Sequence, residues 1–319
     1  MKKSFKKIIN KIKKRIKYIK KNVNYIYEKS NNSKISIFFD MIYCKIRYDI
    51  SINEYRIYEF YLIDDDKRKT YLSIKEHNKM SNKLFDNKIN SVISNKKLFN
   101  SRFKKYMNTE IYDLSDYNFK SFEEYIMKNK IIIARSKSNS FIKSYKVYDI
   151  KDFRGPAFIS DSIKKNNLSI IEKKYSQKKE LNEISDLVII NITSIYSDGV
   201  YIISSSIKYK ENEQIYTGFI DYKKGIIKGN IKDEKGLNVT DKFNKFEIPS
   251  YDKIKKLVFE LAKELEEINE IEWSFIVDNR GSVHLIDANK WEDYVFAQTP
   301  EFLNNRVGLR GFYKRITKK

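Results

Sequence analysis

Two oxygen-bearing side chains close a predicted strand near the end of the sequence. Asp287 and Asn289 are two residues apart, and alternate residues of a strand share one face, so both point the same way. Glu272 and Ser274 have the same spacing on the preceding strand. Magnesium prefers oxygen ligands, usually one or two carboxylates together with the phosphates of a substrate. The pattern predicts a magnesium site beside a nucleotide's phosphates; the alternative is a polar hairpin end that only contacts solvent.

A β-hairpin must position these side chains. Trp273–Val277 and Ser282–Ile286 are β-rich runs, and the turn between them, Asp278–Gly281, ends in a glycine that can supply a positive φ value. An amphipathic helix is predicted over residues 251–270, and residues 79–130 also have a helical pattern. Further strands are predicted at Ile131–Ala134, Leu187–Thr193, Val200–Ile207 and Ile215–Ile220.

The hairpin and its flanking segments carry a resemblance. A strand, a turn and a second strand that ends in acid-x-Asn resemble the last strands of the ATP-grasp fold. More specifically, the chain is similar to the sugar-transfer associated ATP-grasp family found among bacterial surface-polysaccharide genes. The match covers most of residues 40–310. The other segments that resemble this family are Tyr55–Leu72, Asn95–Tyr106, Ile170–Ile184, Ile248–Tyr251 and Gln298.

The resemblance implies an α/β (α+β) fold, an ATP-grasp fold with an N-terminal helical and mixed subdomain. Residues 1–29 are expected to form a basic amphipathic helix, residues 30–125 the N-terminal subdomain, and residues 126–319 the ATP-grasp part. Within that part we expect a small lid subdomain at residues 126–175 and a large metal-binding subdomain at residues 176–319.

ATP-grasp enzymes transfer a phosphoryl group from ATP to a carboxylate and then let an amine or another nucleophile displace the phosphate. Such chemistry depends on positioning and on neutralising phosphate charge. The resemblance therefore implies ATP and Mg²⁺ as cofactors, a ligase activity in capsule or exopolysaccharide biosynthesis, and a small-molecule or glycan-linked acceptor. The residues it implies are Asp287 and Asn289 for the metal, Arg135 and Lys97 for the phosphates, Glu172 for the adenine or ribose, and Gln177 on the same hinge segment; Arg135, Asp287 and Asn289 are the expected catalytic residues.

The sequence departs from the family at three places. Ser274 stands where the family has its first metal-binding Asp; a hydroxyl is a weak ligand for Mg²⁺, and Glu272 on the same face could reach the ion instead. Ala134–Val147 corresponds to a Gly-rich phosphate loop but contains no glycine, so its backbone cannot approach phosphates as closely. Asn191 stands where the family has an arginine. The loop side chains that could contact phosphates are Ser136, Lys137, Ser138, Ser140 and Lys143.

The N-terminal segment is basic and amphipathic. Residues 1–22 hold eleven Lys or Arg residues and no acid, which is half of the net charge of +22. Apolar residues recur there at steps of three and four, along one face of a helix. Such a helix can lie on an anionic membrane surface, each nearby Lys contributing about 1 kcal/mol, or its isoleucines can dock on the domain behind it. The apolar stripe consists of Phe5, Ile8, Ile9, Ile12, Ile16, Ile19, Val23 and Ile26.

Composition excludes several classes of protein. No apolar run approaches the roughly 20 residues that span a bilayer, and the first residues lack the apolar core of a signal peptide. One cysteine excludes an internal disulfide and fits the reducing cytoplasm, and with only two histidines a zinc site is not expected. The remaining basic residues are mixed with acids and no nucleic-acid-binding motif is present, so no nucleic-acid partner is expected.

Three hypotheses follow. The first is an ATP- and Mg²⁺-dependent ligase that acts on a surface sugar or its carrier. The second is a catalytically degenerate ATP-grasp protein that binds nucleotide or glycan without turnover, as Ser274 and the glycine-free loop suggest. The third is a basic module bound to a membrane surface or to nucleic acid. The expected location is the cytoplasm, with peripheral contact to the inner membrane face through residues 1–26.

Overall fold

The structure is a computed structural model. It describes residues 2–84, 87–107, 110–137, 140–265, 269–291, 294–303 and 305–318, and the side chains of residues 2–5, 8 and 87 lie outside the description. The chain divides into two compact units. Unit 1 comprises Met1–Lys83 and Asp293–Lys319, and unit 2 comprises Leu84–Glu292. Unit 2 is therefore inserted between two segments of unit 1. The subdomain boundaries expected from the sequence stay predictions.

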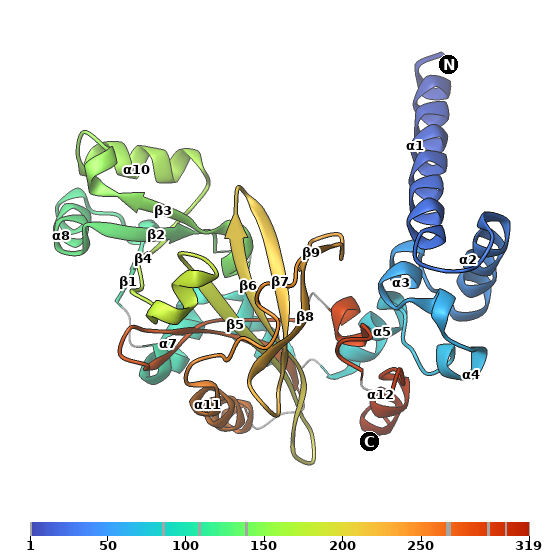
Figure 1. Ribbon diagram of the computed structural model, residues 1–319. Helices are drawn as coiled ribbons and strands as arrows, with labels where there is room; N and C mark the ends of the chain where they lie inside the picture. Colours follow the sequence, from blue (N-terminus) through green and yellow to red (C-terminus); the bar gives the residue numbers. More distant parts are fainter. Residues whose placement is uncertain are drawn as a thin grey trace. The chain divides into compact units, whose positions relative to one another are not determined.

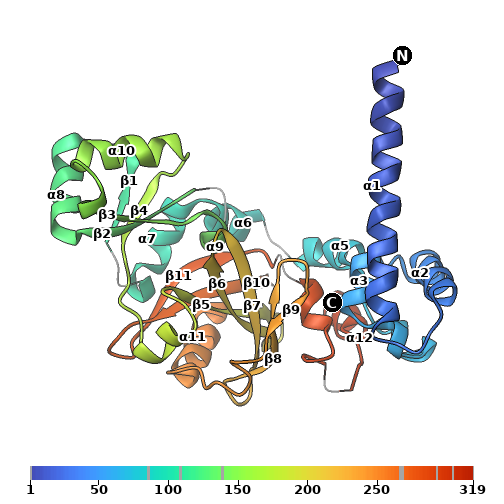
Figure 2. The ribbon, with the colours of Figure 1, turned by 45° about the horizontal axis from the view of Figure 1, so that its top comes forward.

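Unit 1 is built from helices. Its longest helix, α1, extends beyond the other helices of the unit (Figures 1 and 2). Helix α2 begins where the Ser33 hydroxyl accepts from the Ser36 N–H, and it ends where Asp49 takes a left-handed φ of 54°. The elements are α1 (Lys2–Tyr27), α2 (Lys34–Tyr48), α3 (Ile52–Ile57), η1 (Phe60–Leu62), α4 (Asp65–Arg68), α5 (Ile74–Leu84), η5 (Tyr294–Gln298) and α12 (Arg310–Ile316).

The buried side chain of Gln298 holds the C-terminal segment against the N-terminal helices. Its Oε1 accepts hydrogen bonds from the N–H groups of Leu72 and Leu309, at 3.1 and 3.0 Å. Its Nε2 donates to the Leu72 carbonyl at 2.8 Å and to the Tyr58 hydroxyl at 3.0 Å. The side-chain amide thus uses both donors and both acceptor positions. Residues on either side of unit 2 in the sequence therefore complete one folded unit.

Unit 2 contains two antiparallel sheets, and the smaller has four strands in the order β1-β4-β2-β3. Helices α8 and α10 lie together along this sheet in both views (Figures 1 and 2). They bury Phe122, Ile126, Ile159 and Ile163 in a core of their own. The elements are β1 (Ile111–Asp113), η2 (Leu114–Asp116), α8 (Phe119–Asn129), β2 (Ile131–Arg135), β3 (Lys146–Asp149), η3 (Ile150–Asp152), α10 (Pro156–Lys165) and β4 (Ile170–Lys173).

The larger sheet has seven strands in the order β11-β10-β5-β6-β7-β8-β9. Helix α11 packs against β5, β10 and β6. The strands are β5 (Val188–Tyr196), β6 (Val200–Glu211), β7 (Gln214–Asp221), β8 (Ile226–Asp233), β9 (Asn238–Thr240), β10 (Asn269–Val277) and β11 (Val283–Asn289). The helices associated with it are α6 (Asn87–Ser94), α7 (Lys96–Met107), α9 (Phe141–Ser144), η4 (Lys179–Glu183) and α11 (Tyr251–Glu264).

The two faces of the seven-stranded sheet differ in chemistry. Trp273 and Ile192 of one face join Val258 of α11 and Phe103 of α7 in the main hydrophobic core. This burial of apolar area is what fixes the sheet between its helices, at roughly 25 cal/mol for each Å² removed from water.

The opposite face carries polar side chains in cross-strand register. Ser274 pairs with Asp287 of β11, and Glu272 pairs with Asn289. On the other side of β10, Ser274 pairs with Asn191 of β5. The four side chains of the predicted hairpin therefore lie on one face, as their spacing predicted.

The α/β class predicted from the sequence is confirmed, and so are the strands around residues 131–134, 187–193, 200–207 and 215–220 and the late hairpin. Gly281 has the predicted positive φ, 78°. Two predictions about helices are wrong in part. The first concerns residues 79–130, where strand β1 interrupts the helices. The second concerns residues 251–270, where α11 ends at Glu264 and residue 269 already belongs to β10, because that segment pairs with β5.

None of the helices in the described ranges is both long enough and apolar enough to cross a membrane.

Gly308→Ala is expected to lower the free energy of unfolding by about 1–3 kcal/mol, because a β-carbon would meet backbone that cannot easily move. It would lie 2.5 Å from the Tyr71 Cα and 2.6 Å from the Thr70 carbonyl oxygen. Denaturant unfolding measures the change. Gly311→Ala is the matched control: a β-carbon there meets no atom within 4 Å, and alanine is favoured in helix α12 by about 0.5–1 kcal/mol. Equal losses in both variants would contradict the close approach.

Candidate functional site

The Asp287 carboxylate is fully buried and accepts hydrogen bonds from three different elements. The Lys96 ammonium, at the start of α7, contacts Oδ1. The backbone N–H of Phe141, at the start of α9, donates to Oδ2 at 3.0 Å, and Asn289 Nδ2 donates to the same oxygen at 3.0 Å. An ionised carboxylate is costly to bury unless it is paired and hydrogen-bonded, and here it is both.

Arg135 and Glu172 form a second buried ion pair that lies next to the first. They stand at diagonal positions on the adjacent strands β2 and β4. Arg135 Nε donates to Glu172 Oε1 at 2.7 Å, and both side chains are 0% exposed. Arg135 Nη1 lies 4.0 Å from Asp287 Oδ1, and the guanidinium lies 5.4 Å from the centre of the Phe141 ring. The four-stranded sheet and the seven-stranded sheet thus meet at a cluster of two cations and two anions.

Two nitrogens of the Arg135 guanidinium make no hydrogen bond to the described residues. These are the terminal nitrogens, Nη1 and Nη2, and both are buried. Guanidinium donates two parallel hydrogen bonds to phosphate or carboxylate oxygens. These nitrogens are therefore the feature of the cluster that best fits a bound anion.

The cluster favours the ionised forms of Arg135 and Asp287. Burial alone would raise the pKa of Asp287, but the Lys96 and Arg135 charges more than offset this, so its pKa lies below the usual 3.8. Burial would likewise lower the pKa of Arg135, and the Glu172 and Asp287 carboxylates reverse that effect and raise it. Burial, reinforced by Arg135, lowers the pKa of Lys96, and Asp287 counteracts this only in part. The two cations and the two anions of the cluster therefore shift one another's pKa values, and their charges offset each other.

Polar residues continue from the cluster across the polar face of the large sheet. Ser274 Oγ donates to Asn191 Oδ1 at 2.6 Å. Lys208 of β6 donates to Glu272 at 2.9 Å, and both side chains are less than a tenth exposed. Such a face, buried yet hydrophilic, is suited to a polar ligand.

The structure brings five of the predicted residues into or beside this region and leaves two elsewhere. Arg135, Glu172, Asp287, Asn289 and Glu272 lie in the cluster or on the adjoining polar face. The Lys97 side chain is 73% exposed and pairs with Asp116 at 3.3 Å. Gln177 Nε2 donates to Asn182 and to the Ser185 carbonyl, and its Oε1 accepts from the Val188 N–H, so it shapes the segment that leads into β5. Ser138 of the loop lies outside the described residues.

Sequence reasoning missed Lys96, although a signal for it exists. Lys96, Phe99, Phe103 and Met107 are all buried and recur at steps of three and four on one face of α7. A lysine in phase with an apolar stripe points inward, where it needs an anionic partner. Lys97 is one residue out of phase and faces solvent.

The residues present do not fit a magnesium ion in this arrangement. The carboxylate proposed as the main ligand, Asp287, is already neutralised by Lys96, and Glu272 is paired with Lys208. The Ser274 hydroxyl is hydrogen-bonded to Asn191. Within the described ranges no three His, Cys, Asp or Glu side chains gather in a group that could hold a metal. At Asp287 the cation in place is the lysine ammonium.

A scan against models of known protein families finds no match, and a search among curated proteins finds none either. Among solved structures, the chain is similar to N5-carboxyaminoimidazole synthase from Aspergillus clavatus in complex with ADP and 5-aminoimidazole ribonucleotide, with a TM-score of 0.40, 12% identity and coverage of 62% of this chain and 44% of that one. It is similar to the D-alanine-D-alanine ligase from Coxiella burnetii, with a TM-score of 0.44, 7% identity and coverage of 72% and 57%.

A third solved structure is the ATP-grasp ligase PsnB complexed with minimal precursor, Mg and ADP, with a TM-score of 0.43, 9% identity and coverage of 72% of this chain and 60% of that one. The chain spans about half the length of the first solved structures it matches. All three similarities have TM-scores below 0.5. At such TM-scores they support nothing about activity.

Lys96→Met is expected to lower the free energy of unfolding by about 3–5 kcal/mol, because it leaves the buried Asp287 carboxylate without its ammonium partner. Denaturant unfolding measures the loss. The loss should shrink as pH falls toward the usual carboxyl pKa. Lys96→Met removes one of the charges that lower the pKa of Asp287, so this pKa is expected to rise in the variant, and proton uptake then relieves the unpaired charge as pH falls. In the natural chain the pKa of Asp287 lies below 3.8, so the stability contributed by its ionised form is lost as pH falls.

Lys97→Met is the matched control for this experiment. Its exposed ion pair is expected to change the free energy of unfolding by less than about 1 kcal/mol. Equal losses in the two variants, or a loss from Lys96→Met that does not vary with pH, would contradict the inward position of Lys96.

Proposed function

We propose that the chain is an ATP-grasp ligase-like protein that binds ATP between the two sheets of unit 2. It would activate a carboxylate as an acyl phosphate for transfer to an amine or sugar acceptor. The proposed setting is cytoplasmic synthesis of a cell-surface polysaccharide, a capsule or exopolysaccharide, as in the family that the sequence resembles. The acceptor would be a small molecule or a glycan-linked group.

The observation that supports the proposal most directly is the pair of terminal nitrogens of Arg135. A buried donor without a partner costs about 1–3 kcal/mol, and a bound anion would remove that cost. The nitrogens lie where the two sheets of unit 2 meet, and Nη1 is 4.0 Å from the Asp287 oxygen that the Lys96 ammonium contacts. A phosphate group bound there would face two cations.

The proposed reaction has two steps. A carboxylate oxygen of the substrate attacks the γ-phosphorus of ATP, and the bond from that phosphorus to the bridging oxygen breaks, giving an acyl phosphate and ADP. An amine or hydroxyl of the acceptor then attacks the acyl carbon and loses its proton, and inorganic phosphate leaves.

The residues of this chain would contribute to those steps by positioning and by charge. Arg135 would donate to phosphate oxygens, with its orientation fixed by Glu172 through Nε. Glu172 Oε2 accepts from the Tyr175 hydroxyl at 3.1 Å, so a contact with adenine or ribose would use its remaining lone pairs. No step is assigned to Mg²⁺, although the resemblance implies it, because Asp287, Asn289 and Glu272 do not fit the ion here.

The second candidate is a degenerate ATP-grasp protein that binds nucleotide or glycan without turnover. The pairing of Asp287 with Lys96 and of Ser274 with Asn191 supports it, because both pairs occupy groups that the family uses for metal. The two candidates share the nucleotide site and differ in whether ADP is released.

Contact between α1 and an anionic membrane is proposed separately. It concerns unit 1 and does not depend on nucleotide binding.

Arg135→Lys is expected to weaken ATP binding roughly ten- to a hundredfold, because lysine keeps the charge but loses the two parallel donors, and a charge-assisted hydrogen bond contributes about 1.5–3 kcal/mol. Titration calorimetry measures the affinity. Arg102→Lys on the exposed side of α7 is the control and should leave it unchanged. Equal affinities for all three proteins would exclude Arg135 from the nucleotide site.

ADP release separates the ligase from the binding protein. With ATP, Mg²⁺ and candidate carboxylic acids and amines, a ligase releases ADP, and this release falls in Arg135→Lys. ATP binding without ADP release supports the degenerate protein, and a gain of release in Ser274→Asp would then identify a decayed active site. Absence of any ATP binding by the natural chain would exclude both candidates.

A further inference from the structure

A surface of unit 1 has the chemistry of a lipid-binding site. Helix α2 is 15 residues long and exposes large apolar side chains along much of its length. Ile46 is 80% exposed, Ile35 71% and Phe39 63%. Single exposed apolar residues are ordinary, but a contiguous apolar patch of this kind marks an interaction surface. The remaining large apolar residues exposed on α2 are Phe38, Ile42 and Tyr43.

Helix α1 packs against α2 and also exposes apolar side chains. Val23 and Ile26, near the end of α1, are buried and anchor it. Ile12 and Ile16, earlier on the same stripe, are 53% and 59% exposed. Among the side chains of the stripe that the structure describes, docking on the rest of the unit, one of the alternatives predicted from the sequence, therefore accounts only for those near the end of α1.

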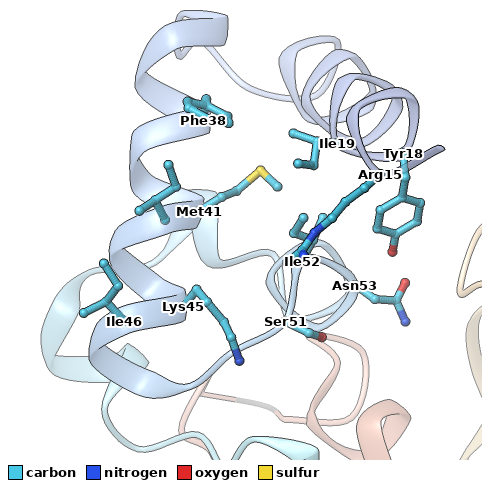
Figure 3. Close-up of a pocket in the computed structure, with 11 residues that line it drawn as sticks. Arg15, Tyr18, Ile19, Phe38, Met41, Lys45, Ile46, Ser51, Ile52 and Asn53 are labelled. Atoms are coloured by element: carbon cyan, nitrogen blue, oxygen red, sulfur yellow. The ribbon is translucent and has the colours of Figure 1, made fainter. Parts of the chain in front are cut away.

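A groove of about 440 Å³ lies between α1, α2 and the start of α3. This is within the range of sites that hold small ligands, roughly 300–1,000 Å³. Figure 3 shows Met41 of α2 and Ile19 of α1 turned toward the space between the helices. Arg15 and Lys45 are among the described residues that line the groove, and Lys45 is also ion-paired with Asp49. An apolar interior with cations beside it matches a molecule that joins an acyl chain to an anionic head group.

Charge decides among the partners that could cover this surface. Residues 1–22 carry eleven Lys or Arg residues and no acid, so α1 surrounds its exposed isoleucines with positive charge alone. A second copy of this chain would bring the same positive charge and be repelled. The phosphates of a nucleic acid would neutralise the lysines of α1, but the apolar side chains of α2 would stay exposed to water. An anionic lipid surface would neutralise the lysines and also bury the apolar side chains.

We propose that α1 and α2 together form a binding surface for bilayers that contain anionic phospholipid, with the groove between them taking up an acyl chain of one lipid. The apolar residues of α2 enter the boundary between head groups and acyl chains, and the lysines of α1 contact the head groups. This goes beyond a contact made by α1 alone, and it is independent of the nucleotide site in unit 2.

The full chain is tested by flotation with vesicles of phosphatidylcholine, with and without phosphatidylserine. Binding should require phosphatidylserine. The double variant Phe39→Ser, Ile46→Ser should lower the partition coefficient at least about tenfold, since burying each such side chain contributes about 1.5–3 kcal/mol. The matched control is Met127→Ser, Phe158→Ser, which removes two side chains of unit 2 with similar exposure, 57% and 53%, and should not change it.

A tryptophan in the groove reports on the acyl chain. Phe38→Trp should be quenched by phospholipids that carry bromine on their acyl chains, whereas the natural Trp273 and Trp291, which are buried, should not. Absence of quenching would overturn the groove as a lipid site. Vesicle binding that the α2 variant leaves unchanged would overturn the two-helix surface. Loss of RNA retention or of self-association by that variant, with vesicle binding intact, would assign the surface to those partners instead.

Discussion

A carboxylate cannot stay ionised inside a protein unless its charge is met there, and the core of unit 2 is organised around this constraint at Asp287. The side chain receives an ammonium from α7, a backbone N–H from α9 and an amide from its own strand, and a guanidinium from β2 lies 4.0 Å away. Elements that are distant in sequence are therefore held in one relative arrangement. The same arrangement leaves two Arg135 nitrogens without a hydrogen-bond partner among the described residues.

The sequence was most informative where local rules decide the structure. A period of two placed Asp287 and Asn289 on one face, and a glycine in the turn fixed the hairpin. The partners of Asp287 on other elements could not be predicted from local rules, because Lys96 is 191 residues away and stands in a chain with many lysines. Its phase with the apolar stripe of α7 was the one local signal. The end of α11 was mispredicted because pairing of the next residues with β5 outweighs their helical pattern.

The polar side chains on the large sheet are of types that could bind a ligand, but they are already hydrogen-bonded to one another. Ser274 bonds to Asn191 and Lys208 to Glu272, so these groups satisfy one another. A ligand that enters must replace each such hydrogen bond with one at least as good, or the exchange costs free energy. Arg135 differs from them, because an anion adds hydrogen bonds to it without breaking its bond to Glu172. Binding of an anion therefore requires less rearrangement than binding of a metal ion at Asp287.

The insertion of unit 2 into unit 1 has a consequence for biosynthesis. Gln298 joins the C-terminal segment to the backbone of Leu72, and no residue before Asp293 can supply that contact to unit 1. On the ribosome, the first 83 residues emerge long before their partner segment, while Leu84–Glu292 emerge as one uninterrupted stretch. Folding during translation is therefore expected to begin with the later-starting unit. The Leu72 backbone and the Tyr58 hydroxyl, which Gln298 contacts in the folded unit, lack this partner until the segment that contains Gln298 is made.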